Sequence, residues 1–168
     1  MTFEEADRYI NCTKTVINDD GQETASYEAS MNTKGYYQFK LKSEDVPDQE
    51  FILVIRPNVK IGVKMTLHLM SDQKEGLVRL DYNGSHQNPL VWQEGVPEVF
   101  KPYAGHQFQN QTHLHQFVEN YSLKWALPIS DTTIEPKAIN NADNKAGWQE
   151  ATDGFCKYLN IQGKVTLK

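Results

Sequence analysis

Four polar side chains fall into two matched pairs near the middle of the chain. Arg79 and Asp81 are two residues apart, and so are His113 and His115 in a later segment. Side chains two residues apart on a β-strand project from the same face, so each pair shares a face if its segment is a strand. If the two strands are neighbours in a sheet, all four polar groups converge on one patch.

Such a patch has the groups needed to cleave a phosphodiester. One imidazole can remove the 2′-hydroxyl proton, another can protonate the leaving oxygen, and a guanidinium can hold the charged phosphorane. Histidine suits both proton transfers because its pKa is near neutrality. His86 and Asn88 follow the turn at 83–85, and His68 could extend the patch. The predicted catalytic residues are His113, His115, Arg79, Asp81 and His86, in a mechanism that needs no metal or other cofactor.

The same histidines also allow a metal-site hypothesis. The spacing His113-x-His115-x-x-x-Glu119 matches the first half of the metal motif of cupin barrels, and His86 or Asp81 could complete the ligands. The cupin glycine six residues before the first histidine is absent. Glu119 would also have to curl back to the histidine face. We therefore expect two imidazoles without a third ligand within reach, and no bound metal.

A third interpretation gives these residues no function. Arg79 and Asp81 would form an ion pair on an exposed sheet face, where such a pair contributes about 0 to 1 kcal/mol. His113 and His115 would belong to a solvated strand face. The three interpretations stay open on the sequence alone.

The composition is that of a globular but acidic chain. Its 168 residues, of which 39% are hydrophobic and 23% charged, predict a single domain covering 1–168. The net charge of -5 argues against a broad hold on nucleic acid and leaves room for a local basic site. An acidic surface can instead mimic phosphate in the channel of a nuclease. Four aromatic residues of a Pro- and Gly-containing loop could anchor such a partner or stack bases: Trp92, Phe100, Tyr103 and Phe108.

The sequence predicts neither export nor membrane insertion. The opening MTFEEADRYIN carries three carboxylates where a secretory signal needs basic and apolar residues. The longest apolar run, 51–55, is far shorter than the roughly 20 residues of a membrane span. Cys12 and Cys156 have no metal-binding spacing and are predicted to be buried thiols. We expect a cytoplasmic protein without a membrane partner.

Hydrophobic periodicity supplies the elements that must position the candidate residues. A capping box formed by Thr2 and Glu5 predicts a helix over 3–12, and a second helix begins at Asp143 or Asn144. A hairpin is predicted over 13–30, and alternating patterns or short apolar runs bounded by turn residues predict strands over 35–42, 50–56, 60–70, 77–82, 112–118, 125–129 and 165–167. The intervening 83–110 is predicted to be a long loop.

Short connections between these strands favour antiparallel pairing. The fold class predicted from this pattern is α+β, with an antiparallel sheet of five or more strands and an N-terminal and a C-terminal helix packed on it.

The chain resembles an uncharacterised family of small bacterial and phage proteins. The residues that carry the resemblance are Arg79-Leu80-Asp81-x-x-Gly84-x-His86-x-Asn88-Pro89, then His113-Leu114-His115, then Trp125-Ala126-Leu127-Pro128. More distantly, the chain is similar to the TumE-like toxins of toxin–antitoxin modules, which carry a similar arginine–aspartate strand and a later His-x-His strand. That similarity implies RNA-directed chemistry and a cognate antitoxin as a partner.

Two main functional hypotheses follow. The first is a nucleic-acid-directed protein of the toxin–antitoxin or phage-conflict type, possessing metal-independent ribonuclease activity. His113 and His115 would be acid and base, Arg79 would bind phosphate, and Asp81 would orient Arg79 or a histidine. The second is a phage- or mobile-element-encoded inhibitor of a host defence nuclease, similar to an anti-CRISPR protein, that binds its target through the aromatic loop. A cupin-like metal-binding protein is the third alternative.

Overall fold

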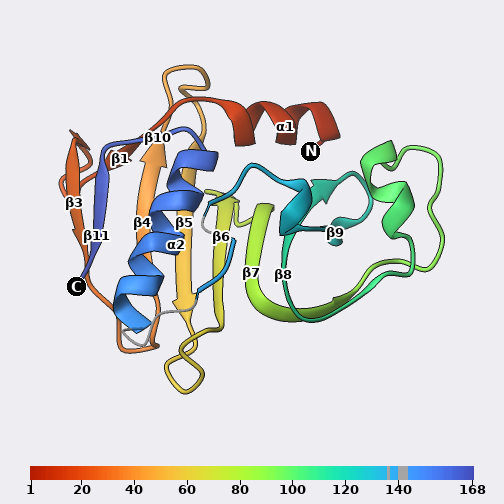
Figure 1. The fold of residues 1–168 in the computed structure, drawn as a ribbon. Coiled ribbons are helices and arrows are strands. Elements are labelled where there is room, and N and C mark those ends of the chain that lie inside the picture. Colours follow the sequence, from red (N-terminus) through yellow and green to blue (C-terminus); the bar gives the residue numbers. More distant parts are fainter. Residues whose placement is uncertain (136, 140–143) are drawn as a thin grey trace.

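The computed structural model describes residues 1–135, 137–139 and 144–168, and most of its strands join one large sheet (Figure 1). Among these residues, nine strands pair in the order β10-β1-β4-β5-β6-β7-β8-β9, with β2 beside β1. A separate two-stranded sheet joins β11 to β3 in parallel. In chain order the elements are α1 (Phe3–Asn11), β1 (Lys14–Ile17), β2 (Glu23–Thr24), β3 (Ser26–Ala29), β4 (Tyr37–Lys42), β5 (Glu50–Pro57), β6 (Met65–Ser71), β7 (Gly76–Gln87), the 3₁₀ helix η1 (Glu98–Tyr103), β8 (Gln107–Val118), β9 (Ser122–Pro128), the 3₁₀ helix η2 (Ile129–Asp131), α2 (Asn144–Tyr158), β10 (Ile161–Gln162) and β11 (Lys164–Leu167).

The predicted fold class is confirmed. Strands β4 to β9 pair with their neighbours in antiparallel fashion, as their connections require. Helix α1 begins after Thr2, whose Oγ1 accepts a hydrogen bond from the Glu5 amide at 3.1 Å. Helix α2 is described from Asn144, and Asp143 lies outside the described residues. In the described part of the chain, neither helix combines the length and the apolar character needed to cross a membrane.

Several element boundaries and the pairing of the last strand differ from the prediction. Strand β6 begins at Met65 because the preceding chain forms a turn closed by the Asn58 amide and the Lys64 carbonyl at 2.8 Å. Strands β7 and β8 extend into the predicted loop, which shrinks to 88–106. Bulges between β7 and β8 and a positive φ of 51° at Asn83 break the alternation that sequence reading depends on. The final strand, β11, pairs with β3 outside the main sheet.

The apolar face of the sheet is covered by both long helices. Figure 1 shows α2 running across β4, β5 and β6, with α1 along one end of the sheet. Ala6 and Ile10 of α1 and Phe155 of α2 belong to the same buried core as Leu53 and Leu67. Neither α1 nor α2 lies on the opposite face of the central strands. The two cysteines are buried free thiols, as predicted.

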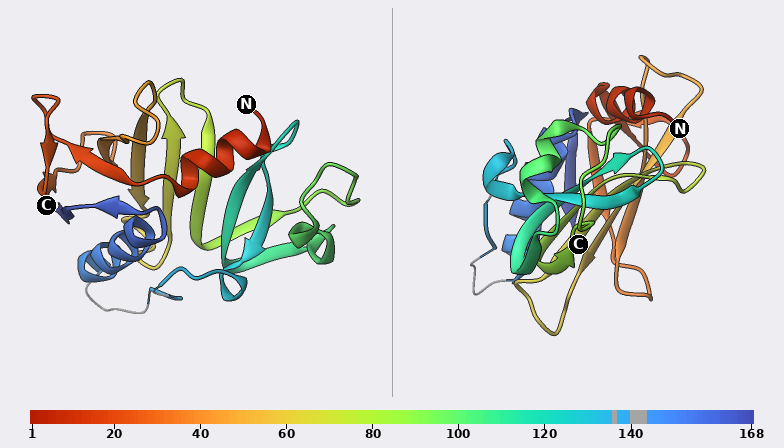
Figure 2. Two further views of the ribbon diagram at one scale, coloured as in Figure 1. Left: turned by 90° about the horizontal axis from the view of Figure 1, so that it is seen from above. Right: turned by 90° about the vertical axis from the view of Figure 1, so that its right-hand side faces the viewer.

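A second, smaller core lies under η1. Phe100 and Trp125 are both 0% exposed there, with ring centroids 5.9 Å apart, and Val96, Val118 and Leu127 surround them. Figure 1 and the left view of Figure 2 place η1 at one end of the molecule, with β3 and β11 at the other. The long β7–β8 hairpin reaches from the main core to this second core.

Asn88 fastens the loop after β7 to β9. Its side chain is 2% exposed, donates to the carbonyls of Tyr103 at 3.0 Å and Ala126 at 2.9 Å, and accepts from the Ala126 amide at 2.9 Å. Asn88→Ala leaves these buried groups unpaired and is expected to cost about 3 kcal/mol of unfolding free energy, measured by urea denaturation. Asn11→Ala removes one exposed side-chain hydrogen bond, to Asp7 Oδ1, and should cost less than about 1 kcal/mol. Equal losses in the two variants would contradict the role assigned to Asn88.

Candidate functional site

The two polar pairs meet across β7 and β8. The strand register places Arg79 opposite His115 and Asp81 opposite His113. Thr66 and His68 of β6 extend the same patch, because they lie opposite Asp81 and Arg79 respectively. The structure thus brings together Arg79, Asp81, His113 and His115, which two-residue spacing had placed on common faces.

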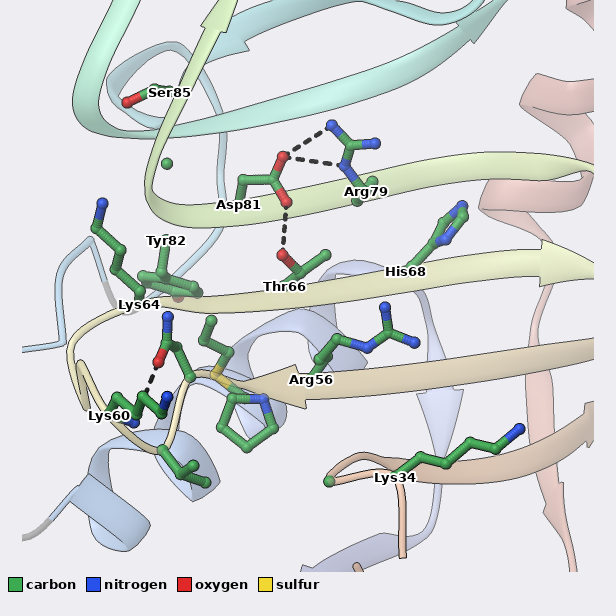
Figure 3. Close-up of a pocket in the computed structure, with 16 residues that line it drawn as sticks. Lys34, Arg56, Lys60, Lys64, Thr66, His68, Arg79, Asp81, Tyr82 and Ser85 are labelled. Carbon is green, nitrogen blue, oxygen red and sulfur yellow. Dashed lines mark hydrogen bonds and ion pairs between the residues drawn. The ribbon is translucent and has the colours of Figure 1, made fainter. Parts of the chain in front are cut away.

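Asp81 is the centre of this cluster. Its Oδ2 accepts hydrogen bonds from Arg79 at 2.9 Å, and its Oδ1 accepts from the Thr66 hydroxyl at 2.9 Å (Figure 3). The Oδ2 atom is also 3.2 Å from His115 Nε2. Burial alone would raise the pKa of Asp81, but the charge of Arg79 and the hydrogen bond from the Thr66 hydroxyl outweigh it and hold the pKa well below its usual range. The carboxylate is therefore ionised near neutral pH.

Backbone carbonyls fix the tautomers of the two histidines. The Nδ1–H of His113 donates to the Gln111 carbonyl at 2.7 Å, and that of His115 donates to the Leu123 carbonyl at 2.8 Å. In each neutral ring the lone pair is then on Nε2, the nitrogen that faces Asp81. Arg79 Nη2 donates to His115 Nε2 at 2.9 Å. His113 Nε2 is 3.7 Å from Asp81 Oδ2 and has no hydrogen-bond partner among the described residues.

The bent end of the β7–β8 hairpin encloses the histidines. Phe108 stacks on His113 with ring centroids 4.6 Å apart, and His86 meets His115 edge to face at 4.5 Å. A Cβ added at Gly84 would lie 3.0 Å from both His113 Cε1 and Asp81 Cβ, so this position favours glycine. His113 and His115 are 0% exposed. Burial lowers the pKa of His113 to about 4.

His86 belongs to the enclosure and is held by the backbone. Its Nε2 donates to the Lys124 carbonyl at 3.0 Å, and the ring is half-buried between the two strands. Burial lowers the pKa of His86. The structure therefore places this third predicted catalytic histidine beside the cluster, with its Nε2 already hydrogen-bonded to the backbone.

An open hollow of about 820 Å³ adjoins the cluster on the face of the sheet opposite α1 and α2. Arg79 and Asp81 form part of its lining, whereas His86, His113 and His115 do not. Its cationic side chains come from several elements, and Figure 3 shows them around one concavity: Lys34, Arg56, Lys60, Lys64 and Arg79. Asp81 is the single carboxylate among the described lining residues.

Sequence reasoning missed most of this hollow. Lys34 precedes β4, Arg56 ends β5, and Lys60 lies in the turn before β6. No motif or short-range spacing connects these residues, because strand pairing alone brings them together. The alternation of polar and apolar residues along β6 was the sequence signal here, and it marked a polar face without indicating that the face is cationic.

Several predicted site residues lie elsewhere. Glu119 is exposed in the turn between β8 and β9, whereas the described carboxylate that approaches both histidines is Asp81. Phe100 and Phe108 are 0% exposed, so neither presents a surface anchor. Trp92 and Tyr103 are partly buried against the second core. The predicted aromatic partner-binding loop is thus largely packed inward.

Comparison with known proteins gives a family but no activity. The sequence model of a family of unknown function (DUF6978) matches residues 1–161. No curated protein and no solved structure matches the chain. The function therefore has to be argued from the site itself.

Proposed function

The chain belongs to this family of unknown function over residues 1–161, and we propose that it binds RNA through the phosphodiester backbone at the cationic hollow. The membership agrees with the predicted resemblance to an uncharacterised family. The similarity to TumE-like toxins remains a prediction, and it favours the same class of ligand.

The observation that carries the proposal is the charge of the hollow. Five lysine and arginine side chains and one carboxylate line it among the described residues, in a chain whose net charge is -5. In an acidic chain, such a local excess of positive side chains is not expected if charges are distributed at random. Clustered cations bind a nucleic-acid backbone by neutralising phosphates and releasing their counterions. The local basic site that the overall charge leaves room for is thus present at this hollow.

The hollow also offers two arginine side chains suited to phosphate. The guanidinium of Arg56 lies over the Tyr36 ring, 5.1 Å from the ring centroid, and this cation–π contact helps to orient it. Arg79 is held by Asp81 and is 32% exposed, so part of its fork is open to a ligand. Arginine forks match the geometry of phosphate oxygens. We assign Arg56 and Arg79 to direct phosphate contacts, and the lysines to the positive electrostatic potential of the hollow.

The proposal is limited to binding. Ribonuclease activity would require His113 and His115 to reach the RNA, but both are fully buried and neither lines the hollow. Their acid and base roles stay a prediction that requires the hairpin to open. Inhibition of a nuclease through the aromatic loop is not proposed, because Phe100 and Phe108 belong to the interior.

Charge reversal in the hollow tests the proposal. Binding of a fluorescently labelled 12-nucleotide single-stranded RNA would be measured by anisotropy for the wild type and for Lys60→Glu/Lys64→Glu. We expect the affinity to fall by at least about 10-fold, and the slope of its salt dependence to fall by about 0.7 for each phosphate that is no longer neutralised. The matched control is Lys157→Glu/Lys164→Glu, which makes the same charge change at exposed positions of α2 and β11 that do not line the hollow.

Two results would overturn the proposal. The first is an equal decrease of affinity in the hollow and control variants, which would show that only net charge matters. The second is the absence of RNA binding by the wild type at low salt. The same titrations, followed by gel electrophoresis of the RNA, report whether the bound strand is cut.

A further inference from the structure

Three potential metal ligands converge beneath the hollow. One carboxylate oxygen of Asp81 and one ring nitrogen each of His113 and His115 all lie within 4.8 Å of one another. The two imidazoles are 0% exposed and the Asp81 side chain is 16% exposed. The sequence-based hypothesis took Glu119 as the third ligand, with His86 or Asp81 completing the set, and expected no third ligand within reach. The structure differs, because it places an Asp81 oxygen of the neighbouring strand within 3.7 Å of both histidines.

The hydrogen bonds around the cluster orient these atoms as ligands. Each histidine donates its Nδ1–H to a backbone carbonyl, which leaves a lone pair on the inward-facing Nε2. Histidines that ligate metals are usually held in this way by their second nitrogen. The Thr66 hydroxyl occupies the other carboxylate oxygen of Asp81 and so orients Oδ2 toward the histidines.

An unpartnered atom gives the independent indication. His113 Nε2 is buried and has no hydrogen-bond partner in the described part of the chain, and Asp81 Oδ2, at 3.7 Å, is itself an acceptor. Two acceptors facing each other in a buried site are unfavourable unless a proton or a cation lies between them. A bound cation would satisfy both atoms together with His115 Nε2.

We propose that Asp81, His113 and His115 form a binding site for a divalent transition-metal ion of the zinc class. Two imidazole nitrogens and one carboxylate oxygen are ligands that zinc prefers. Tetrahedral ligands at about 2.0 to 2.1 Å from an ion lie about 3.4 Å from each other. The Asp81 oxygen is 3.2 Å from His115 Nε2 and 3.7 Å from His113 Nε2, close to this separation, and all three ligand atoms lie within 4.8 Å of one another, so binding an ion would draw the three side chains together. This inference does not rest on RNA binding.

Arg79 competes with the ion for the same atoms. Its guanidinium donates to both Asp81 Oδ2 and His115 Nε2, and therefore acts as the cation of the cluster. A metal ion would displace it. Because Arg79 is 32% exposed and lines the hollow, its side chain can turn outward into that space. Metal and arginine would then occupy alternative positions in one network.

Metal binding can be measured directly on the untagged chain. Protein treated with chelator and dialysed would be titrated with ZnCl₂ by calorimetry, and with CoCl₂ by visible absorption as a spectroscopic probe of nitrogen and oxygen ligands. We expect one ion per chain, and a decrease of affinity of at least about 10-fold in His113→Ala and in His115→Ala. His68→Gln, which changes a neighbouring histidine outside the ligand set, should retain wild-type affinity.

Arg79→Ala provides the sharpest test because its two expected effects have opposite signs. Removing the competing guanidinium should tighten zinc binding, whereas RNA binding should weaken. Thermal unfolding with and without ZnCl₂ confirms that each variant is folded. A wild type that binds no zinc stoichiometrically, a His113→Ala variant with unchanged affinity, or weaker zinc binding in folded Arg79→Ala would overturn the metal site. RNA binding that persists in the first case would leave the proposed function intact.

Discussion

When the pH is lowered from about 7 to about 5, His68 and His113 together are expected to destabilise the metal-free chain by roughly 4 kcal/mol, about half from each. Burial, assisted by the charge of Arg79, lowers the pKa of His68 to about 4, and burial lowers the pKa of His113 to about 4. In the unfolded chain a histidine pKa is about 6.5. Between these values the unfolded state takes up protons that the folded state does not, so stability falls as the pH decreases through this window.

The physical cause is the lack of compensation for a buried imidazolium. The Nε2 atoms of His68 and His113 are buried and have no hydrogen-bond partner among the described residues. A proton added there gains little beyond the attraction of Asp81, while the unfavourable desolvation is large. Carboxylates contribute little to this change, because most of them titrate below pH 5.

Urea denaturation at pH 7, 6 and 5, in the presence of a chelator, measures the effect. His68→Gln and His113→Gln should each remove about half of the pH dependence, since glutamine does not titrate in this range. The comparison depends on how the unfolding free energy changes with pH and not on its absolute value, so a variant that is less stable at every pH remains informative. A urea midpoint of the wild type that stays constant or rises from pH 7 to pH 5 would contradict the prediction.

The part of the site that the sequence could predict is the part with a two-residue period. Arg79 and Asp81, and later His113 and His115, each occupy alternate positions on one strand, and alternation fixes their faces irrespective of the rest of the fold. The sequence did not show that β7 and β8 are neighbours, and convergence of the four side chains depended on that. In the structure the two strands pair directly and both continue into the predicted loop.

The missed parts depend on contacts between distant segments. Glu119, the third ligand of the metal hypothesis, lies away from the histidines because β8 ends at Val118 and the chain turns there toward β9. The bend that encloses His113 depends on Gly84 and on bulged pairing, which leave no periodic signal. The aromatic loop formed a core of its own, since large rings in a long connection are stabilised by burial as readily as by a partner.

Lys14 is the feature least expected from the sequence, because lysine is seldom fully buried. It is 0% exposed, at the start of β1 between the two long helices. Its Nζ donates to the carbonyls of Ile10 at 2.7 Å, Cys12 at 2.9 Å and Leu159 at 3.1 Å. These carbonyls belong to the C-terminal ends of α1 and α2, where helices leave acceptors unpaired and favour a positive charge. One side chain thereby connects the first and last parts of the fold.

Lys14→Ala is therefore expected to cost about 3 to 5 kcal/mol of unfolding free energy, since it leaves three buried acceptors unpaired and opens a cavity. Lys14→Met fills most of that volume and removes the buried charge, whose desolvation lowers the pKa of Lys14 in the folded chain. It should cost less than Lys14→Ala but still about 1 to 3 kcal/mol, because the acceptors remain unpaired. Urea denaturation of both variants separates packing from hydrogen bonding, with the exposed Lys157→Met as the control. If Lys14→Met were as stable as the wild type, the cost of burying the ammonium would equal its hydrogen bonds, and the helix ends would not depend on Lys14.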